Sequence, residues 1–131
     1  MKTFKYFLFI AAVAMLTSCA STAKFPVSRD VPAANIVAKK KQDKNNNYVI
    51  KLTAENLAAP GRLSPPKNNY SVWIVTKNGD VKNLGQLSFR NAKKVVLEAV
   101  TPFDAKEILI TAENEGDLAY PEGIRISRAK F

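Results

Sequence analysis

The stretch that decides the fold is Tyr70–Lys77, which reads YSVWIVTK and is rich in β-branched and aromatic residues. Successive side chains of a strand point to opposite faces of its sheet. Val72 and Ile74 would therefore lie on one face, and Trp73 and Val75 on the other. Since both faces are apolar, the stretch predicts a central strand that is covered on both sides.

A hairpin turn is predicted directly after this strand. The pair Asn78-Gly79 separates two strand-like runs, and it is the strongest short-range hairpin signal because both turn positions take positive φ. The returning strand is Val81–Phe89. It contains Gly85, which inside a strand indicates a bulge or a close approach of another part of the chain.

Alternation of apolar and polar residues extends to both sides of this hairpin. Further strands are predicted at Tyr48–Glu55, Lys93–Val100, Glu107–Glu113 and Gly123–Arg128. The longest loop is Ala59–Asn69, whose three prolines and one glycine interrupt a hydrogen-bond ladder. With a short edge strand at Asn35–Ala38, the sequence predicts an all-β fold, an antiparallel β-sandwich of about six to seven strands.

An export signal is predicted at residues 1–18. Lys2 and Lys5 give it a positive start, and the apolar run Tyr6–Leu16 follows. At ~1.5 Å per residue this run would span about 16 Å as a helix, whereas the hydrocarbon core of a bilayer is ~30 Å thick. A short apolar run between a basic start and small residues is typical of a cleaved signal.

The end of this segment, Leu16-Thr17-Ser18-Cys19, resembles the lipobox of bacterial lipoproteins. The resemblance implies cleavage between Ser18 and Cys19, a diacylglyceryl group on the Cys19 thiol, and acylation of the new amine, for instance with palmitate. Cys19 is the only cysteine, so in an ordinary secreted protein it would be a lone thiol in an oxidising compartment. Two acyl chains suffice for stable anchoring, and we therefore expect a membrane-anchored lipoprotein of the cell envelope.

The residues after the cysteine bear on the choice of membrane. Ala20, Ser21 and Thr22 include no acidic side chain. They resemble neither the aspartate signal for inner-membrane retention nor the acidic surface-export signal of some bacterial groups. We expect the outer membrane, facing the periplasm, rather than the inner membrane.

Residues 19–47 are predicted to be the lipidated cysteine and a flexible basic tether, which leaves residues 48–131 as the folded domain. Residues 20–47 hold six basic and two acidic side chains, with Pro26 and Pro32 among them. Such a composition buries little apolar surface. The run Lys39–Lys41 allows two interpretations, a solvated tether or attraction to anionic lipid. We expect no nucleic-acid partner for an exported protein.

A set of motifs in the second half resembles the extracytoplasmic domain of the anti-sigma-K factor family. The motifs are Tyr70-Ser71-Val72-Trp73, Gly79, Gly85, Thr111-Ala112-Glu113, Glu115-Gly116 and Pro121-Glu122-Gly123. The resemblance covers about Tyr48–Arg128 and implies an immunoglobulin-like β-sandwich. Members of that family carry a sigma-binding domain and a transmembrane helix before this domain. This sequence shows neither, so we do not extend sigma-factor binding to it.

Residues for reaction chemistry are scarce. Histidine is absent and the one cysteine is assigned to lipid, which excludes His-containing triads, cysteine nucleophiles and the usual zinc sites. The acidic turn at residues 113–117 offers oxygen ligands for calcium but lacks the ligand spacing of a calcium loop. We therefore expect no enzyme, no cofactor and no metal.

Binding is the remaining class of function. Trp73 is expected in the core. If it lies on an outer sheet face instead, Tyr70 and Trp73 would form a partner surface with Arg62 and Lys67, because aromatic residues and arginine are enriched at interface cores.

The loops Ala59–Asn69 and Asn114–Gly123 are further candidates for contacts, since loops on a rigid scaffold commonly carry binding. The leading hypothesis is a lipid-anchored, non-catalytic envelope protein that binds another envelope component, protein or polymer. The alternative is a structural or assembly subunit that pairs through an exposed sheet edge.

Overall fold

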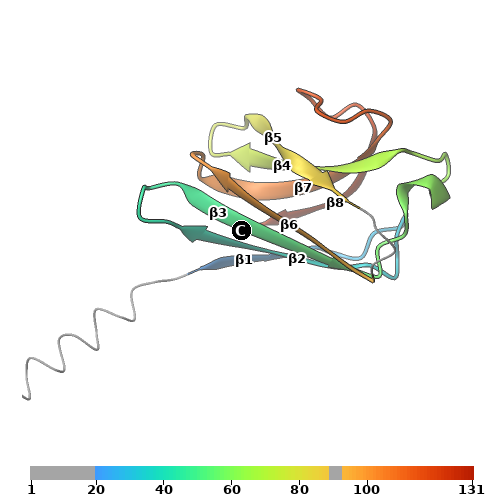
Figure 1. Cartoon of the computed structure of the whole chain (residues 1–131), viewed down its shortest axis with the longest axis horizontal. Coiled ribbons are helices and arrows are strands. Elements are labelled where there is room, and N and C mark those ends of the chain that lie inside the picture. Colours follow the sequence, from blue (N-terminus) through green and yellow to red (C-terminus); the bar gives the residue numbers. More distant parts are fainter. Residues whose placement is uncertain (1–19, 89–92) are drawn as a thin grey trace, which may run out of the picture.

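The computed structural model describes residues 20–88 and 93–131, which form a two-layered β-sandwich (Figure 1). The export signal and the predicted cleavage and lipid site at Ser18 and Cys19 lie outside the described residues. The elements are β1 (Ser21–Lys24), β2 (Asn35–Gln42), β3 (Tyr48–Glu55), the 3₁₀ helix η2 (Pro60–Arg62), β4 (Asn69–Thr76), β5 (Val81–Leu87), β6 (Lys94–Thr101), β7 (Ala105–Glu113) and β8 (Ile124–Lys130).

The strands form two antiparallel sheets, with the orders β1-β2-β3-β6 and β5-β4-β7-β8. The second order corresponds to strands C′, C, F and G of immunoglobulin-like domains. The predicted all-β sandwich of immunoglobulin-like type is thus confirmed. Strand β4 lies between β5 and β7, as its two apolar faces predicted.

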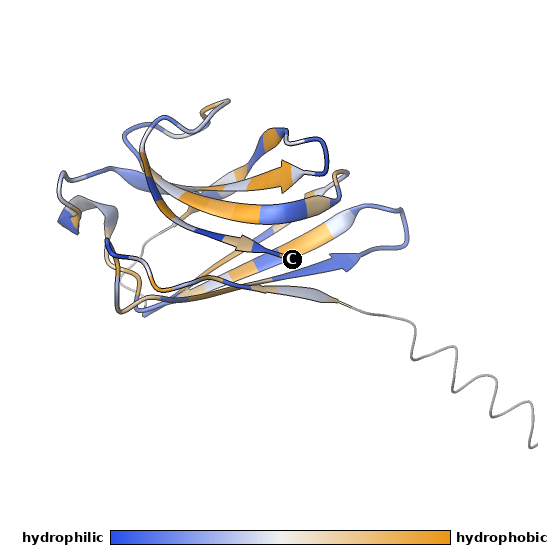
Figure 2. Ribbon diagram, turned by 180° about the vertical axis from the view of Figure 1, so that it is seen from behind, coloured by the Kyte–Doolittle hydropathy of each residue, from blue (hydrophilic) through white to orange (hydrophobic). Residues whose placement is uncertain are grey.

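The core lies between the two sheets and follows the period-2 alternation of the strands. Val72 and Ile74 of β4 point inward, and Ile50 and Leu52 of β3 point toward them from the other sheet; all four belong to one buried cluster. Figure 2 shows hydrophobic residues on strands of both sheets. Burial of apolar area at roughly 25 cal/mol per Å² is the main force that holds the layers together.

The segment predicted as a flexible tether is instead part of the sandwich. Strands β1 and β2 complete the first sheet, and Ala23, Ile36 and Ala38 are buried in the core. The prediction failed because Ala and Lys dominate this stretch and obscure its alternation. As a result the described residues form eight strands rather than six or seven, and the first of these strands begins at Ser21, two residues after Cys19.

The middle lysine of the Lys39–Lys41 run shows that the side chains of β2 alternate between the core and the outer face. Lys40 points inward and is 9% exposed. Its ammonium donates to Asp104 Oδ1 and to the Ala105 carbonyl, both at 2.7 Å. Its charge is thereby paired, which a buried ammonium requires. The other two lysines of the run are exposed on the outer face.

The β4–β5 hairpin is confirmed, but its turn differs from the prediction. Gly79 has a φ of 87°, whereas Asn78 is not among the residues with positive φ. The amide of Gly79 donates to the Thr76 carbonyl, and the amide of Thr76 donates to the Asp80 carbonyl. This is the pattern of a type I turn followed by one left-handed residue.

Gly85 is confirmed as a point of close approach. Its φ is 146°, and a Cβ there would lie 3.2 Å from Leu97 Cδ1 of the other sheet. The β4–β5 register shifts next to it, between Val72 and Trp73. Glycine is needed here because a side chain would strain the backbone and crowd the core.

Candidate functional site

The four predicted partner-binding residues do not form one surface. Arg62 lies exposed in η2, and Lys67 lies half-buried at the end of the same β3–β4 loop. Tyr70 and Trp73 are both 0% exposed. The prediction of a surface made by these two aromatic residues is therefore wrong. Tyr70 faces the core, where its hydroxyl donates to the Ala58 carbonyl at 2.7 Å.

Trp73 is buried, yet it does not lie between the two sheets. It points to the outer face of sheet β5-β4-β7-β8, opposite to its neighbours Val72 and Ile74. Its Nε1 donates to Thr111 Oγ1 at 2.8 Å. A buried indole N–H requires such a partner. The side chain is thus both buried and on an outer face, which the two sequence interpretations treated as exclusive.

The hydrogen bond to Thr111 continues into the loop between β7 and β8. The Thr111 hydroxyl donates to Glu113 Oε2 at 2.5 Å. Glu113 is 1% exposed, and its carboxylate accepts from the Glu122 amide at 3.3 Å. We name Trp73, Thr111, Glu113 and the Glu122 amide the buried polar chain. It connects the sheet face to the loop above it.

The β7–β8 loop, residues 114–123, folds back over this face (Figure 1). Asn83 Nδ2 of β5 donates to the Leu118 carbonyl at 3.0 Å. A Cβ on Gly116 would meet the Gln86 side chain at 2.2 Å, and one on Gly123 would meet the Ala112 carbonyl oxygen at 1.9 Å. The loop therefore packs directly on the sheet and covers Trp73.

The two loops expected to carry contacts are hydrogen-bonded to each other. The Asn68 amide donates to the Glu113 carbonyl at 3.0 Å, and Asn68 Nδ2 donates to the Asn114 carbonyl at 2.8 Å. Within the β3–β4 loop, the Lys67 amide donates to the Pro60 carbonyl at 2.9 Å. Loops held in this way lose less conformational entropy on binding than free loops.

We name the surface formed by residues 56–68 and 114–123 the loop end. A small hollow of about 210 Å³ lies where the two loops meet, and Lys67, Glu113, Glu115 and Glu122 are among its lining residues. Tyr120, which the sequence interpretation passed over, is 72% exposed on the second loop. The loop end thus offers both charges and an exposed aromatic ring to a partner.

The loop end lies far from the start of the fold. Figure 1 shows β1 beginning at one end of the sandwich and the loop end at the other. The register agrees, because Ser21 pairs with Lys40, whose ammonium contacts Ala105 at the start of β7, whereas Glu113 is at the other end of β7.

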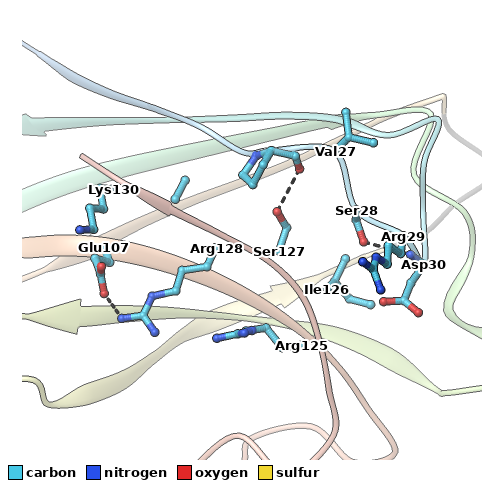
Figure 3. A pocket seen from close by; sticks show the side chains of 12 residues that line it. Val27, Ser28, Arg29, Asp30, Glu107, Arg125, Ile126, Ser127, Arg128 and Lys130 are labelled. Carbon is cyan, nitrogen blue, oxygen red and sulfur yellow. Dashed lines mark hydrogen bonds and ion pairs between the residues drawn. The ribbon is translucent and has the colours of Figure 1, made fainter.

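A larger groove of about 520 Å³ runs between β8 and the segment Pro26–Asp30 (Figure 3). Ser127 Oγ donates to the Pro26 carbonyl at 3.1 Å and holds the two walls together. Arg128 forms an ion pair with Glu107, whereas Arg125, which also lines the groove, takes part in none of the ion pairs between described residues. The segment Pro26–Asp30 therefore lies beside the edge of β8 and covers one side of it.

The described ranges, 20–88 and 93–131, contain no group of three or more His, Cys, Asp or Glu side chains that could hold a metal ion. Glu113 lines the loop-end hollow with Glu115 and Glu122, but its carboxylate accepts hydrogen bonds from Thr111 and the Glu122 amide. Within the same ranges, no helix is long and apolar enough to cross a membrane.

No family model, no curated protein and no solved structure matches this chain. The resemblance to the anti-sigma-K factor family therefore stays a prediction.

The buried polar chain and the packed loop are the features that the sequence interpretation missed. A signal was present in the second half of β7, where Thr111 and Glu113 share a face with Leu109 and the other residues, Ile108, Ile110 and Ala112, are apolar. Two polar residues on a covered face indicate that something polar packs on them, because buried polar groups are hydrogen-bonded.

Proposed function

We propose that this protein is a lipid-anchored, non-catalytic component of the bacterial cell envelope that binds another envelope protein or polymer through the loop end. The observation that carries the proposal is the position of the loop end. Its two loops are hydrogen-bonded together and lie at the opposite end of the sandwich from Ser21, the first strand residue after Cys19.

The anchor part of the proposal rests on the lipobox resemblance and on chain connectivity. Ala20 alone separates Cys19 from β1, so acyl chains on Cys19 would hold the sandwich directly at the bilayer surface. Attachment at one end would leave the loop end free to meet a partner. The outer membrane, facing the periplasm, is the proposed location because no acidic residue follows Cys19 directly.

The binding part rests on the chemistry of the loop end. Tyr120 is its exposed aromatic ring, and Arg62 is its exposed guanidinium. Tyrosine and arginine are enriched among the residues that carry most of the energy of protein interfaces. The absence of histidine in the whole chain also favours binding over general acid–base chemistry.

Pairing through a sheet edge has less support. The β1 edge is four residues long, β5 carries the register shift at Gly85, and β8 is flanked by Pro26–Asp30. Short, bulged or covered edges are the means by which β-proteins avoid such pairing. Strand β6, which carries Lys94 and Glu98, is the edge that remains for the alternative.

Photo-crosslinking in living cells tests the proposal. A photoreactive phenylalanine analogue at position 120 or 62 should give a discrete crosslinked species from the envelope fraction. The same analogue at Asn45, exposed in the β2–β3 turn at the other end of the sandwich, is the matched control. Crosslinks only from position 45, or only between copies of this chain, would contradict binding through the loop end.

A further inference from the structure

The outer face of sheet β1-β2-β3-β6 is open and positively charged. Its exposed cations are Lys24, Lys39, Lys41, Lys51 and Lys94, and we name this surface the lysine face. The carboxylates on the same face are Glu55 and Glu98. Among the described residues the ion pairs involve Lys40, Lys106 and Arg128, so none includes a cation of the lysine face.

The charge is concentrated on the side of β1 and β2. Lys39 lies directly opposite Lys51 across β2 and β3, and like charges in such positions are destabilising. Both carboxylates lie farther from β1, with Glu98 on β6 opposite Lys51 and Glu55 on β3 opposite Lys94. An anionic layer against the β1 and β2 side would relieve this repulsion.

Valines lie between these lysines. Val96 is 46% exposed and Val100 is 62% exposed, while Val37 and Val49 are half-buried. An open surface that carries both cations and small apolar groups suits the boundary between lipid headgroups and acyl chains. By contrast, the outer face of the other sheet is covered by the β7–β8 loop.

The position of Ala20, directly before β1, indicates what binds to this face. Ala20 lines a shallow hollow of about 710 Å³ on the lysine face, together with Lys39, Lys41, Lys51 and Val49. Cys19 is bonded to Ala20, and one extended residue spans at most ~3.6 Å. A lipid on Cys19 would therefore enter the bilayer beside these lysines and would keep this end of the face near the headgroups.

We propose that the lysine face lies on the anionic phospholipid headgroups of the leaflet that holds the acyl chains of Cys19. The inference rests on the proposed anchor and adds an orientation to it. The β1-β2-β3-β6 sheet faces the membrane, whereas the other sheet and its covering loop, residues 114–123, face away from it.

Lysine footprinting of the acylated protein tests this orientation. The full-length protein is purified from membranes, its acylation is verified by intact mass, and it is reconstituted into vesicles of phosphatidylcholine alone or of an equimolar mixture with phosphatidylglycerol. A water-soluble amine-acetylating reagent then reports the reactivity of each lysine by peptide mass spectrometry. Lys67, at the loop end, is the internal reference.

In the anionic vesicles we expect the labelling of Lys24 and Lys94 to slow by at least about fivefold relative to phosphatidylcholine, the equivalent of ~1 kcal/mol per lysine at the headgroups. Lys67 should react equally in both. High salt should remove the protection, because the Debye length falls from ~10 Å at 0.1 M to ~3 Å at 1 M.

Two double variants with the same charge change distinguish an effect of the lysine face from an effect of the protein's net charge. Lys39→Glu with Lys51→Glu should restore the labelling of Lys24 in anionic vesicles, whereas Lys77→Glu with Lys130→Glu, the same charge change on exposed residues of the other sheet's strands and turn, should not.

Equal labelling in both vesicle types, or an equal effect of the two variant pairs, would overturn the orientation and leave the anchor standing. Protection already present in detergent would assign the face to a second copy of the chain and overturn it too. A chain without acyl groups would overturn both the anchor and the orientation.

Discussion

Replacing Thr111 by valine tests the buried polar chain that joins the β7–β8 loop to the sheet. Valine has nearly the same shape, so packing around residue 111 is kept. The Trp73 N–H loses its acceptor, and Glu113 Oε2 loses its hydroxyl donor. Each buried polar group left without a partner costs about 1–3 kcal/mol. We therefore expect the free energy of unfolding to fall by about 2–5 kcal/mol.

Urea unfolding followed by fluorescence measures this loss, and Trp73 is the chain's single tryptophan. With m-values of about 1–3 kcal/mol per molar urea, the midpoint should fall by roughly 0.7–5 M. Thr111→Ser keeps the hydroxyl and is the matched control, with an expected loss of about 1 kcal/mol. If Thr111→Val unfolds within about 0.5 kcal/mol of the wild type, the hydrogen bonds do not stabilise the loop and the reasoning is refuted.

Three further changes probe other parts of the fold. Gly123→Ala places a Cβ 1.9 Å from the Ala112 carbonyl oxygen and should cost about 2 kcal/mol or more, whereas Gly61→Ala, with nothing within 4 Å, should be nearly neutral in the same urea assay. Burial, and to a lesser extent a nearby carboxylate, raises the pKa of Tyr70 to about 12. Since the unfolded value is ~10, the protein should lose roughly 2–3 kcal/mol between pH 10 and 12, and Tyr70→Phe should lack that part of the slope in alkaline denaturation. Hydrogen bonds from two lysine side chains hold the pKa of Asp104 below its usual value, so the stability it contributes is present above pH ~4 and declines as the pH falls further. Thermal melts of Asp104→Asn should be less sensitive to acid than those of the wild type; equal sensitivity would count against this ion pair.

The sequence predicted the strands whose pattern is locally complete. The stretch from Tyr70 to Lys77 has apolar residues on both faces, and it is the central strand β4. The alternation in Tyr48–Glu55 and Lys93–Val100 likewise predicted β3 and β6, whose Ile50 and Val95 are buried in the core. Such patterns are reliable because period-2 burial follows from strand geometry alone.

Strand β1 was not predicted, and β2 was predicted only as a short edge strand over Asn35–Ala38, because apart from Ile36 their inward residues are small or charged. Ala23 and Ala38 contribute little hydrophobic signal, and Lys40 is buried only because Asp104 and Ala105 accept from its ammonium. Those acceptors lie more than sixty positions away in the chain. No local pattern contains that information.

Only part of the candidate site was predicted, because the rest also depends on contacts between distant parts of the chain. The β3–β4 and β7–β8 loops were identified from their composition, and the structure joins them through Asn68. The exposure of single aromatic residues could not be inferred from composition. Trp73 is covered because a loop forty residues later folds over it, while Tyr120 on that loop is exposed.

The most direct test of the account is an intact-mass measurement of the protein purified from membranes, beside a Cys19→Ala variant. The account predicts a mass equal to residues 19–131 plus acyl chains, and the loss of those chains in the variant. A chain that retains residues 1–18, or one that begins at Cys19 without lipid, would contradict the lipid anchor on which the proposed function and orientation depend.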